Sequence, residues 1–412
     1  MKDQVLLLRE EVEAAESKSA NVDRFLSIVD RYIEIPELTP HILHEFVEKI
    51  VIHAATDPHS KVNRRQEVDI YYKGIGIMEM SKVYDERQKR KKRHSRKLYR
   101  FSLAPQCFLI GSAHMNTDFI KGVVVPMITP IDADEKIDED NFRRQIDYII
   151  DGGLHGILIF GSNGEFYQIE EDEMERGLKI AVEQAADRVP VYFGIGAINT
   201  RKCVRLAKMA AANGAAAVSI LQPMFLKPDQ AELVLHFKTI AEAIPEIPVL
   251  IYNNPGRVGY GLTAALITKL AHEVDNIVGM KDTSGDMTLT EECVRLNRDV
   301  DFKVFGGKDT LLYCSLCVGG VGGVCTAGNF MPELIGAVYE KFAAGDLAGS
   351  LEAQFKLNPV RLSMDAASFP VAAKDMAKLR GLDAGVPYLP SLPTPAPVLE
   401  NIKAAMHEAG LI

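Results

Sequence analysis

The sequence predicts an α/β protein: a (β/α)8 TIM barrel with a C-terminal helical extension, preceded by a small, mostly helical appendage. From Met115 onward, short apolar strands alternate with longer amphipathic helices, which is the pattern of a parallel α/β fold. The strands are apolar almost throughout, and this indicates burial on both of their faces. Eight of them occur within somewhat more than the roughly 250 residues typical of a TIM barrel.

The expected elements follow one another regularly along this region. The eight strands are 122–128, 156–161, 191–196, 216–221, 249–253, 277–281, 303–305 and 322–326. Residues 141–151, 174–186, 201–213 and 231–244 have the apolar spacing of helices that cover such strands. Helical stretches near 351–362, 371–379 and 397–409 predict a cap of helices after the barrel. We therefore expect the barrel over 115–345 and the extension over 346–412.

The segment 1–114 is expected to be a separate appendage that ends in a basic linker. Residues 5–32 have the spacing of a surface helix, and 38–50 predict a second helix with Thr39 as its N-cap. The alternation of apolar and polar side chains over 68–72 suggests a short strand.

About the first eighty residues resemble the C-terminal tail of large serine recombinases, and the stretch 37–76 carries the resemblance. The catalytic serine of that family lies in a separate N-terminal domain, so recombinase activity is not expected here. A gene fusion or a misplaced start codon would explain the join, with Met115 as a natural start.

Composition and charge predict a cytoplasmic globular protein. Hydrophobic residues make up 47% of the chain, and no apolar run approaches the roughly 18 residues of a membrane helix. The net charge is −9, although nine of the fourteen residues over 87–100 are Lys or Arg. An acidic body binds nucleic acid poorly, so we interpret the basic run as a solvated linker and expect no nucleic-acid partner.

The six cysteines are scattered and do not form a disulfide framework, so reduced thiols are expected. Cys314 and Cys317 have C-x-x-C spacing, but no second Cys or His pair stands at the spacing of a zinc site. Packing within a helix is the favoured interpretation of this pair, and no metal is predicted.

Catalytic groups of a TIM barrel stand at the carboxyl ends of its strands. Lys281 ends the sixth strand after a buried apolar run, and burial disfavours its charged form, which supplies the neutral amine that attacks a carbonyl. The alternative is a strand-end lysine whose stem packs while its ammonium reaches water. Tyr252, one strand earlier at the same height, favours the catalytic interpretation because a phenol beside an amine can transfer protons.

The turn after the second strand reads Gly161-Ser162-Asn163-Gly164-Glu165. Glycines allow the backbone to turn tightly or to approach a ligand, and the exposed N–H groups with two polar side chains would suit a carboxylate. An ordinary strand-to-helix turn remains the alternative.

Together these segments resemble the dihydrodipicolinate synthase/N-acetylneuraminate lyase superfamily, from about residue 118 to the C-terminus. The turn at 161–165, Tyr252-Asn-Asn-Pro and Gly279-Met-Lys281 match its three motifs in order and spacing. The resemblance implies that Lys281 forms a Schiff base with pyruvate, that Tyr252 and Ser162 are catalytic, and that no metal or organic cofactor is needed. It also implies a homo-oligomer, a dimer or homotetramer.

The remaining site residues are implied by the same resemblance. Asn163 would bind the pyruvate carboxylate, Val324 would wall the pocket, and Thr283 and Phe225 would contact substrate. Arg257 matches the arginine with which the synthases of the family bind the carboxylate of the second substrate.

Departures from the family pattern guide the choice of reaction. Phe225 stands where the synthases carry a tyrosine that completes a proton relay in the neighbouring subunit, and it has no hydroxyl. Ser162-Asn163 and Lys281-Asp-Thr283 are similar to aldolases of 2-keto-3-deoxy sugar acids and of 4-hydroxy-2-oxoglutarate. We therefore expect a pyruvate-dependent aldolase of this type. The alternative is 4-hydroxy-tetrahydrodipicolinate synthase; sialate lyase is less favoured because Thr310 replaces a glutamate.

Overall fold

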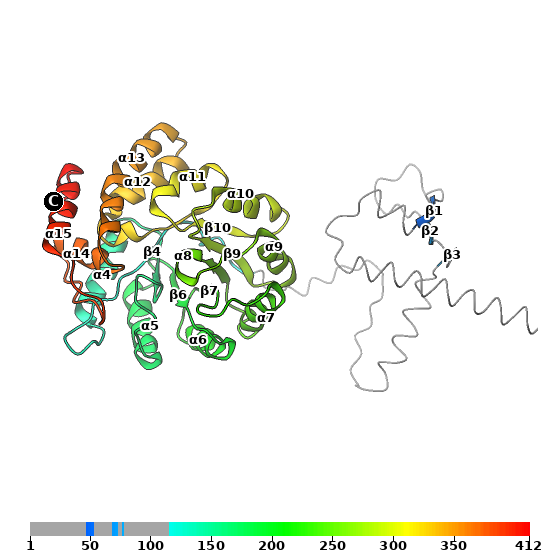
Figure 1. Ribbon diagram of the computed structural model, residues 1–412, viewed down its shortest axis with the longest axis horizontal. Helices are drawn as coiled ribbons and strands as arrows, with labels where there is room; N and C mark the ends of the chain where they lie inside the picture. The colour runs from blue at the N-terminus through cyan, green and yellow to red at the C-terminus, as the bar shows by residue number, and fades with distance from the viewer. Residues whose placement is uncertain (1–46, 53–67, 73–75, 78–114) are drawn as a thin grey trace, which may run out of the picture. The chain divides into compact units, whose positions relative to one another are not determined.

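The computed structural model describes residues 47–52, 68–72, 76–77 and 115–412 (Figure 1). The chain divides into two compact units, Met1–Phe108 and Leu109–Ile412. The described residues of the first unit form a three-stranded antiparallel sheet in the order β1-β2-β3. Its strands are β1 (Val47–Ile52), β2 (Val68–Tyr72) and β3 (Gly76–Ile77).

This sheet corrects the expectation of a helix over 38–50 at residues 47–50. Residues 47–50 belong to β1, which reads VEKIVI, and its β-branched side chains favour a strand because their χ1 freedom is restricted in a helix. Pairing with β2 supplies the backbone hydrogen bonds, with Ile50 opposite Ile70. The strand predicted over 68–72 is confirmed as β2. The helix expected over 5–32, residues 38–46 and the basic run lie outside the described residues.

The second unit contains a closed barrel of eight parallel strands, in the order β10-β11-β4-β5-β6-β7-β8-β9. All eight predicted strands are confirmed, with ends that differ by no more than a few residues. The strands are β4 (Gly122–Pro126), β5 (Gly156–Ile159), β6 (Val191–Ile195), β7 (Ala217–Leu221), β8 (Val249–Asn253), β9 (Ile277–Asp282), β10 (Lys303–Gly306) and β11 (Gly322–Val324).

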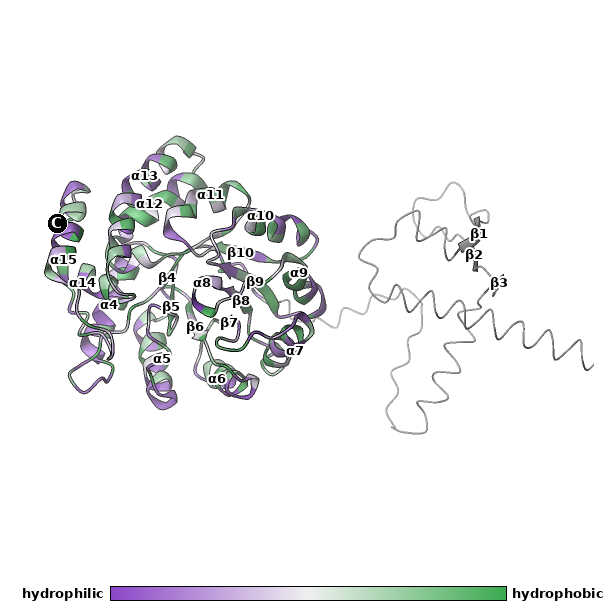
Figure 2. Cartoon of the chain, viewed as in Figure 1, coloured by the Kyte–Doolittle hydropathy of each residue, from purple (hydrophilic) through white to green (hydrophobic). Residues whose placement is uncertain are grey.

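Helices surround this barrel, and each of the longer ones has both hydrophobic and hydrophilic residues on its surface (Figure 2). Side chains cap several of them: Asp229 accepts the backbone N–H of Glu232, whose carboxylate in turn accepts the N–H of Asp229. The helices are α4 (Glu139–Asp151), α5 (Glu171–Ala185), α6 (Thr200–Ala212), α7 (Gln230–Ala241), α8 (Pro255–Val258), α9 (Ala264–Glu273), α10 (Met287–Leu296), α11 (Leu312–Cys317) and α12 (Pro332–Ala343). The four helices predicted by range correspond to α4–α7.

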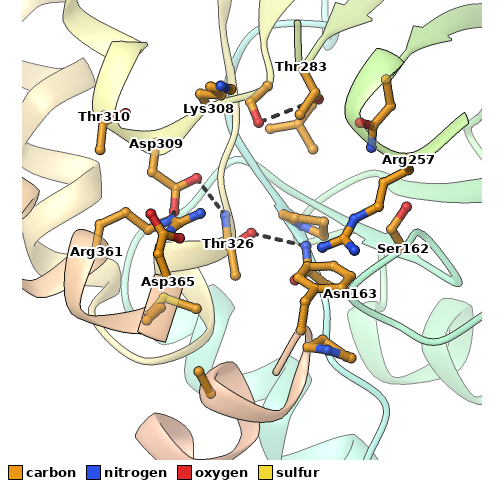
Figure 3. A pocket seen from close by; sticks show the side chains of 18 of the residues that line it. Ser162, Asn163, Arg257, Thr283, Lys308, Asp309, Thr310, Thr326, Arg361 and Asp365 are labelled. Atoms are coloured by element: carbon orange, nitrogen blue, oxygen red, sulfur yellow. Dashed lines mark hydrogen bonds and ion pairs between the residues drawn. The ribbon is translucent and has the colours of Figure 1, made fainter. Parts of the chain in front are cut away.

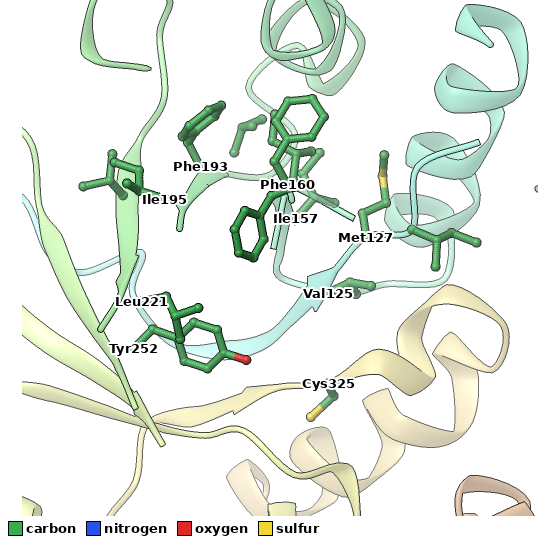
Figure 4. Close-up of a cluster of buried hydrophobic side chains, with 14 of the residues drawn as sticks. Val125, Met127, Ile157, Phe160, Phe193, Ile195, Leu221, Tyr252 and Cys325 are labelled. Carbon is green, nitrogen blue, oxygen red and sulfur yellow. The ribbon is translucent and has the colours of Figure 1, made fainter. Parts of the chain in front are cut away.

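In β4, β5 and β6, alternate residues enter two separate hydrophobic clusters, as the period of a β-strand requires. Val124, Leu158 and Tyr192 belong to the smaller cluster. Their neighbours Val125 and Ile157 belong to the larger one, which the surrounding helices complete (Figure 4). Both faces of the strands are therefore buried, which explains their nearly continuous apolar sequence.

The predicted C-terminal helices are confirmed. They are α13 (Leu347–Ser363), α14 (Val371–Leu379) and α15 (Ala396–Glu408), with a short 3-10 turn, η3 (Met364–Ala366), after α13. In Figure 1, α13 lies beside α12, and the chain ends beyond α15. The segment that joins α13 to α14 reaches the open end of the barrel, where it lines a cavity.

Candidate active site

A cavity of about 430 Å³ opens at the carboxyl ends of the barrel strands (Figure 3). Its inner part is lined by residues of the strands and of the turns that follow them. Its outer wall comes from the extension, between Arg361 in α13 and Ala372 in α14. Seven of the predicted site residues line this cavity: Ser162, Asn163, Tyr252, Arg257, Lys281, Thr283 and Val324.

Lys281 and Tyr252 lie side by side on neighbouring strands. They are register partners in the pairing of β8 with β9, and the Lys281 Nζ lies 4.1 Å from the centre of the Tyr252 ring. Both side chains are buried, with 4% and 6% of their surface exposed. A primary amine and a phenol are therefore held together in a largely dehydrated place that still opens into the cavity.

The environment of Tyr252 favours its phenolate form. Burial alone would raise the pKa of this phenol. The charge of Lys281 and hydrogen bonds from Ser162, Thr283 and Asn254 outweigh burial and lower the pKa below its ordinary value. The Asn254 amide donates to the phenol oxygen at 2.8 Å. Tyr252 can thus give up and regain a proton more readily than an ordinary tyrosine.

The turn at 161–165 is tightly constrained. Phe160, just before the turn, and Glu165, its last residue, have positive φ angles of 52° and 56°, a region that residues other than glycine rarely adopt. A Cβ on Gly164 would lie 3.0 Å from the carbonyl oxygen of Met127, so glycine permits the close approach. Asn163 Nδ2 donates to Thr326 Oγ1 at 3.0 Å. These contacts hold Ser162 and Asn163 at the cavity wall.

A buried ion pair joins this turn to the extension. Lys374 of α14 lies 2.6 Å from the carboxylate of Glu165, and each side chain is only 1% exposed. Lys374 also donates to the carbonyl oxygen of Val386 at 2.8 Å, and the backbone N–H of Tyr388 donates to Glu165 at 3.3 Å. Burial lowers the pKa of Lys374, against the opposing effect of Glu165. The extension therefore contacts the turn at 161–165 directly.

A second charged group forms the far wall of the cavity. Asp309 accepts the backbone N–H groups of Thr326 and Ala327, both at 2.9 Å, and lies 3.4 Å from Arg361. Arg361 also donates to Asp365 at 2.8 Å. The guanidinium of Arg361 is therefore shared by two carboxylates, and Figure 3 shows the three side chains together on one side of the cavity.

Arg257 reaches the cavity from the opposite side. Its guanidinium lies over the ring of Phe369, 4.0 Å from the ring centre, and Phe369 belongs to the extension. A smaller apolar cavity of about 180 Å³ adjoins this stacked pair, lined by Ser162, Phe166, Tyr167, Leu221, Met224, Arg257, Val258 and Phe369. The site thus has a polar main part and an apolar side part.

Phe225 is the one predicted site residue that the cavity of this chain does not include. It lies in the loop after β7, where it is 91% exposed and has a φ of +68°. An aromatic side chain this exposed is unusual in a folded chain. Phe225, which was expected at the relay position of the synthases, is therefore on the surface of this chain and has no hydroxyl.

Sequence reasoning missed several lining residues. Asn254 lies within the Tyr252-Asn-Asn-Pro motif, two residues after Tyr252, and this position was the available signal. Asp309, Arg361 and Phe369 come close to the site only through packing between distant parts of the chain, and no local pattern marks them. Cys314 and Cys317 lie on α11, as expected, and are exposed. Within the described residues, no group of three or more His, Cys, Asp or Glu could hold a metal ion.

The site has a lysine and a tyrosine at the carboxyl end of a TIM barrel, beside a turn suited to a carboxylate. These features are typical of a class I lyase or aldolase, in which an amine forms a Schiff base with a 2-oxo acid. The chain belongs to the dihydrodipicolinate synthetase family, whose model matches residues 119–409. Members of this family are pyruvate-dependent enzymes of that class.

Curated relatives and solved structures agree with this membership. The chain is 32% identical to 4-hydroxy-tetrahydrodipicolinate synthase of Methanopyrus kandleri over 294 residues, which are 71% of this chain and 97% of the relative. It is 36% identical to the enzyme of the same name from Methanosarcina acetivorans, over 66% of this chain and 92% of the relative. YagE, a prophage protein of this family from Escherichia coli K12 solved with pyruvate, has a TM-score of 0.68 and 27% identity, over 71% of this chain and 99% of that structure.

The N-terminal segment has a match of its own. A domain of unknown function, DUF4368, matches residues 11–79, and its description does not mention recombinases. In the described parts of the chain, no helix is both long enough and apolar enough to cross a membrane.

Proposed function

We propose that the chain is an aldolase that cleaves or forms 4-hydroxy-2-oxo acids through a Schiff base on Lys281. The hydrogen bonding around Tyr252 is the observation that carries this proposal: Ser162 and Thr283, both of the same chain, bond to the phenol. Proton transfer in the site then does not depend on a hydroxyl at position 225. Substrates of the 2-keto-3-deoxy sugar acid and 4-hydroxy-2-oxoglutarate types both fit this chemistry.

The first stage is formation of the Schiff base. The amine of Lys281 attacks C2 of the 2-oxo acid, while the turn with Ser162 and Asn163 binds the carboxylate. Tyr252 supplies the proton with which the carbinolamine oxygen leaves as water. The product is a protonated imine that withdraws electrons from C3.

The second stage breaks a carbon–carbon bond. The phenolate of Tyr252 takes the proton of the C4 hydroxyl, and the bond between C3 and C4 breaks. The bond's electron pair forms an enamine with the lysine nitrogen, and C4 leaves as an aldehyde. Protonation of C3 and hydrolysis of the imine then release pyruvate and restore Lys281.

A second candidate is 4-hydroxy-tetrahydrodipicolinate synthase, the name of the curated relatives. Arg257 favours it, because a guanidinium at the cavity suits the carboxylate of aspartate semialdehyde. Arg257 suits 4-hydroxy-2-oxoglutarate equally well, whereas the missing hydroxyl at Phe225 weakens only the synthase.

A comparison of kcat/KM tests the choice. The unmodified protein is assayed for condensation of pyruvate with aspartate semialdehyde and for cleavage of 4-hydroxy-2-oxoglutarate and 2-keto-3-deoxygluconate. We expect cleavage to be faster, and we expect Phe225→Tyr to raise the condensation rate more than the cleavage rates. Efficient condensation by the unmodified protein would overturn the aldolase assignment.

The remaining features of the proposal follow from the family resemblance. We propose a cytoplasmic homo-oligomer that works on a small 2-oxo acid without a metal or an organic cofactor. Residues 1–114 are proposed to be an appendage related to recombinase tails that takes no part in the reaction.

A further inference from the structure

Two cationic side chains at the main cavity have no acidic partner among the described residues. The cavity lining contains Arg257, Lys281, Lys308 and Arg361. Arg361 already forms ion pairs with Asp309 and Asp365. Lys281 forms the proposed Schiff base. Arg257 stacks on an aromatic ring, and Lys308 forms no ion pair within the described part of the chain.

The structure holds Lys308 at the edge of the same cavity as Lys281 and Tyr252. It is the second residue after β10. Its Nζ and Cε lie close to Gly285 in the turn after β9, where a Cβ would be 2.8 Å and 3.0 Å from these two atoms. Gly285 has a φ of +77°, so the turn itself also favours glycine. A Cβ on Gly307 would lie 2.1 Å from Thr283 Oγ1, so the turn that carries Lys308 packs against Thr283. Figure 3 shows Lys308 and Thr283 at the same edge of the cavity.

The charges of a bound substrate can now be matched to the site. The carboxylate next to the reacting carbonyl is bound by the turn with Ser162 and Asn163, close to the positive imine. Arg257 and Lys308 remain as positive charges farther out, at the exposed rim of the cavity. They complement a second carboxylate at the distal end of the substrate. An ammonium group at that end would be repelled, since Asp309 and Asp365 are occupied by Arg361.

We propose that Lys308 determines specificity by binding, with Arg257, the distal carboxylate of a 4-hydroxy-2-oxo diacid. The inference rests on the proposed aldolase function and names its substrate class. Cleavage of such a diacid breaks the bond between C3 and C4 and leaves the electron pair on C3 in the enamine. The proton of the C4 hydroxyl passes to Tyr252, and C4 becomes an aldehyde that carries the distal carboxylate. A proton returned to C3 from Tyr252 converts the enamine into an imine, and water hydrolyses this imine to give pyruvate and the free amine of Lys281.

A matched pair of substrates tests this role. 4-Hydroxy-2-oxoglutarate carries a distal carboxylate, and 4-hydroxy-2-oxopentanoate carries a methyl group in its place. We expect the unmodified protein to have the higher kcat/KM for the diacid. Lys308→Met should lower the ratio of the two kcat/KM values about 10- to 100-fold, the loss expected for one hydrogen bond to a charged group.

Two further variants make the result specific. Lys308→Arg should retain most of the preference for the diacid, because it keeps the charge. Lys208→Met, which removes an exposed lysine of α6 away from the cavity, should leave the ratio unchanged. A ratio that is unaffected by Lys308→Met, or equal rates on both substrates in the unmodified protein, would overturn the proposal.

Trapping separates this failure from failure of the proposed function. Borohydride reduction in the presence of pyruvate reports the Schiff base on Lys281 without a distal group. If the adduct forms but neither 4-hydroxy acid is cleaved, the aldolase function fails, and the inference fails with it. If both acids are cleaved without a preference, only the role of Lys308 is wrong.

Discussion

Removing the charge of Lys374 should destabilise the protein far more than a surface substitution would. The pair with Glu165 has a separation of 2.6 Å and both members are 1% exposed. At an effective dielectric constant of about 20, two unit charges at that distance attract by about 6 kcal/mol. Lys374→Met leaves the carboxylate of Glu165 buried without its partner, and such a loss costs about 3–5 kcal/mol of unfolding free energy.

Urea unfolding of four proteins measures this energy. They are the unmodified chain, Lys374→Met, Glu165→Gln and the double variant. The double variant removes both charges, so it should be more stable than Lys374→Met alone. Lys269→Met is a matched control, because Lys269 and Glu273 are also 2.6 Å apart but 51% and 44% exposed. That substitution should cost less than about 1 kcal/mol.

Two outcomes would refute the reasoning. One is a loss below about 1 kcal/mol for Lys374→Met, which would place the buried pair at the value of an exposed one. The other is a double variant that loses the sum of both single losses, because the two charges would then be uncoupled. Pyruvate trapping on the folded variants gives a second readout. Displacement of the turn with Ser162 should raise the pyruvate concentration needed for half-maximal trapping. It should lower the trapping rate at saturating pyruvate less.

Three further predictions concern other parts of the chain. Lys281→Ala should abolish turnover and the borohydride adduct while circular dichroism stays that of a folded barrel; an adduct on another residue would exclude the mechanism. Burial lowers the pKa of His236 to about 4. Between pH 6.5 and 4 the unfolded chain therefore binds a proton that the folded chain does not, so stability should fall by about 3 kcal/mol as the pH falls through this range. His236→Gln should flatten that dependence in urea titrations at several pH values, and an unchanged slope would contradict it. Deleting 1–114 should leave kcat/KM nearly unchanged, since the described site lies entirely after it; a folded but inactive fragment would show a wrong boundary.

The sequence was most informative where burial dictates residue type. Strands such as β8 are apolar on both faces, so their positions could be predicted closely, and the polar residues that end them mark the site. The prediction of a helix over 38–50 was wrong at β1. A short apolar run with β-branched residues fits either a helix or a strand when the strand that pairs with it is unknown.

The distal half of the site was beyond sequence reasoning for a physical reason. Arg361 and Phe369 have no neighbouring motif, and their roles depend on how the extension packs onto the barrel. Glu165 belonged to a recognised turn, yet its partner lies in α14, far along the chain. Long-range pairs of this kind leave no periodic signal in a single sequence.

The position of the extension also determines when the protein can first become active during its synthesis. A ribosome makes the chain from the N-terminus, so β11 emerges before Arg361, Phe369 and Lys374. At that moment Lys281 and Tyr252 are both present, but the outer wall of the cavity and the partner of Glu165 are not. A nascent chain that ends after β11 lacks the residues that form this wall. If Lys281 forms the proposed Schiff base, we expect the reaction to require the last helices, and a premature stop just after the barrel to leave the lysine without its enclosure.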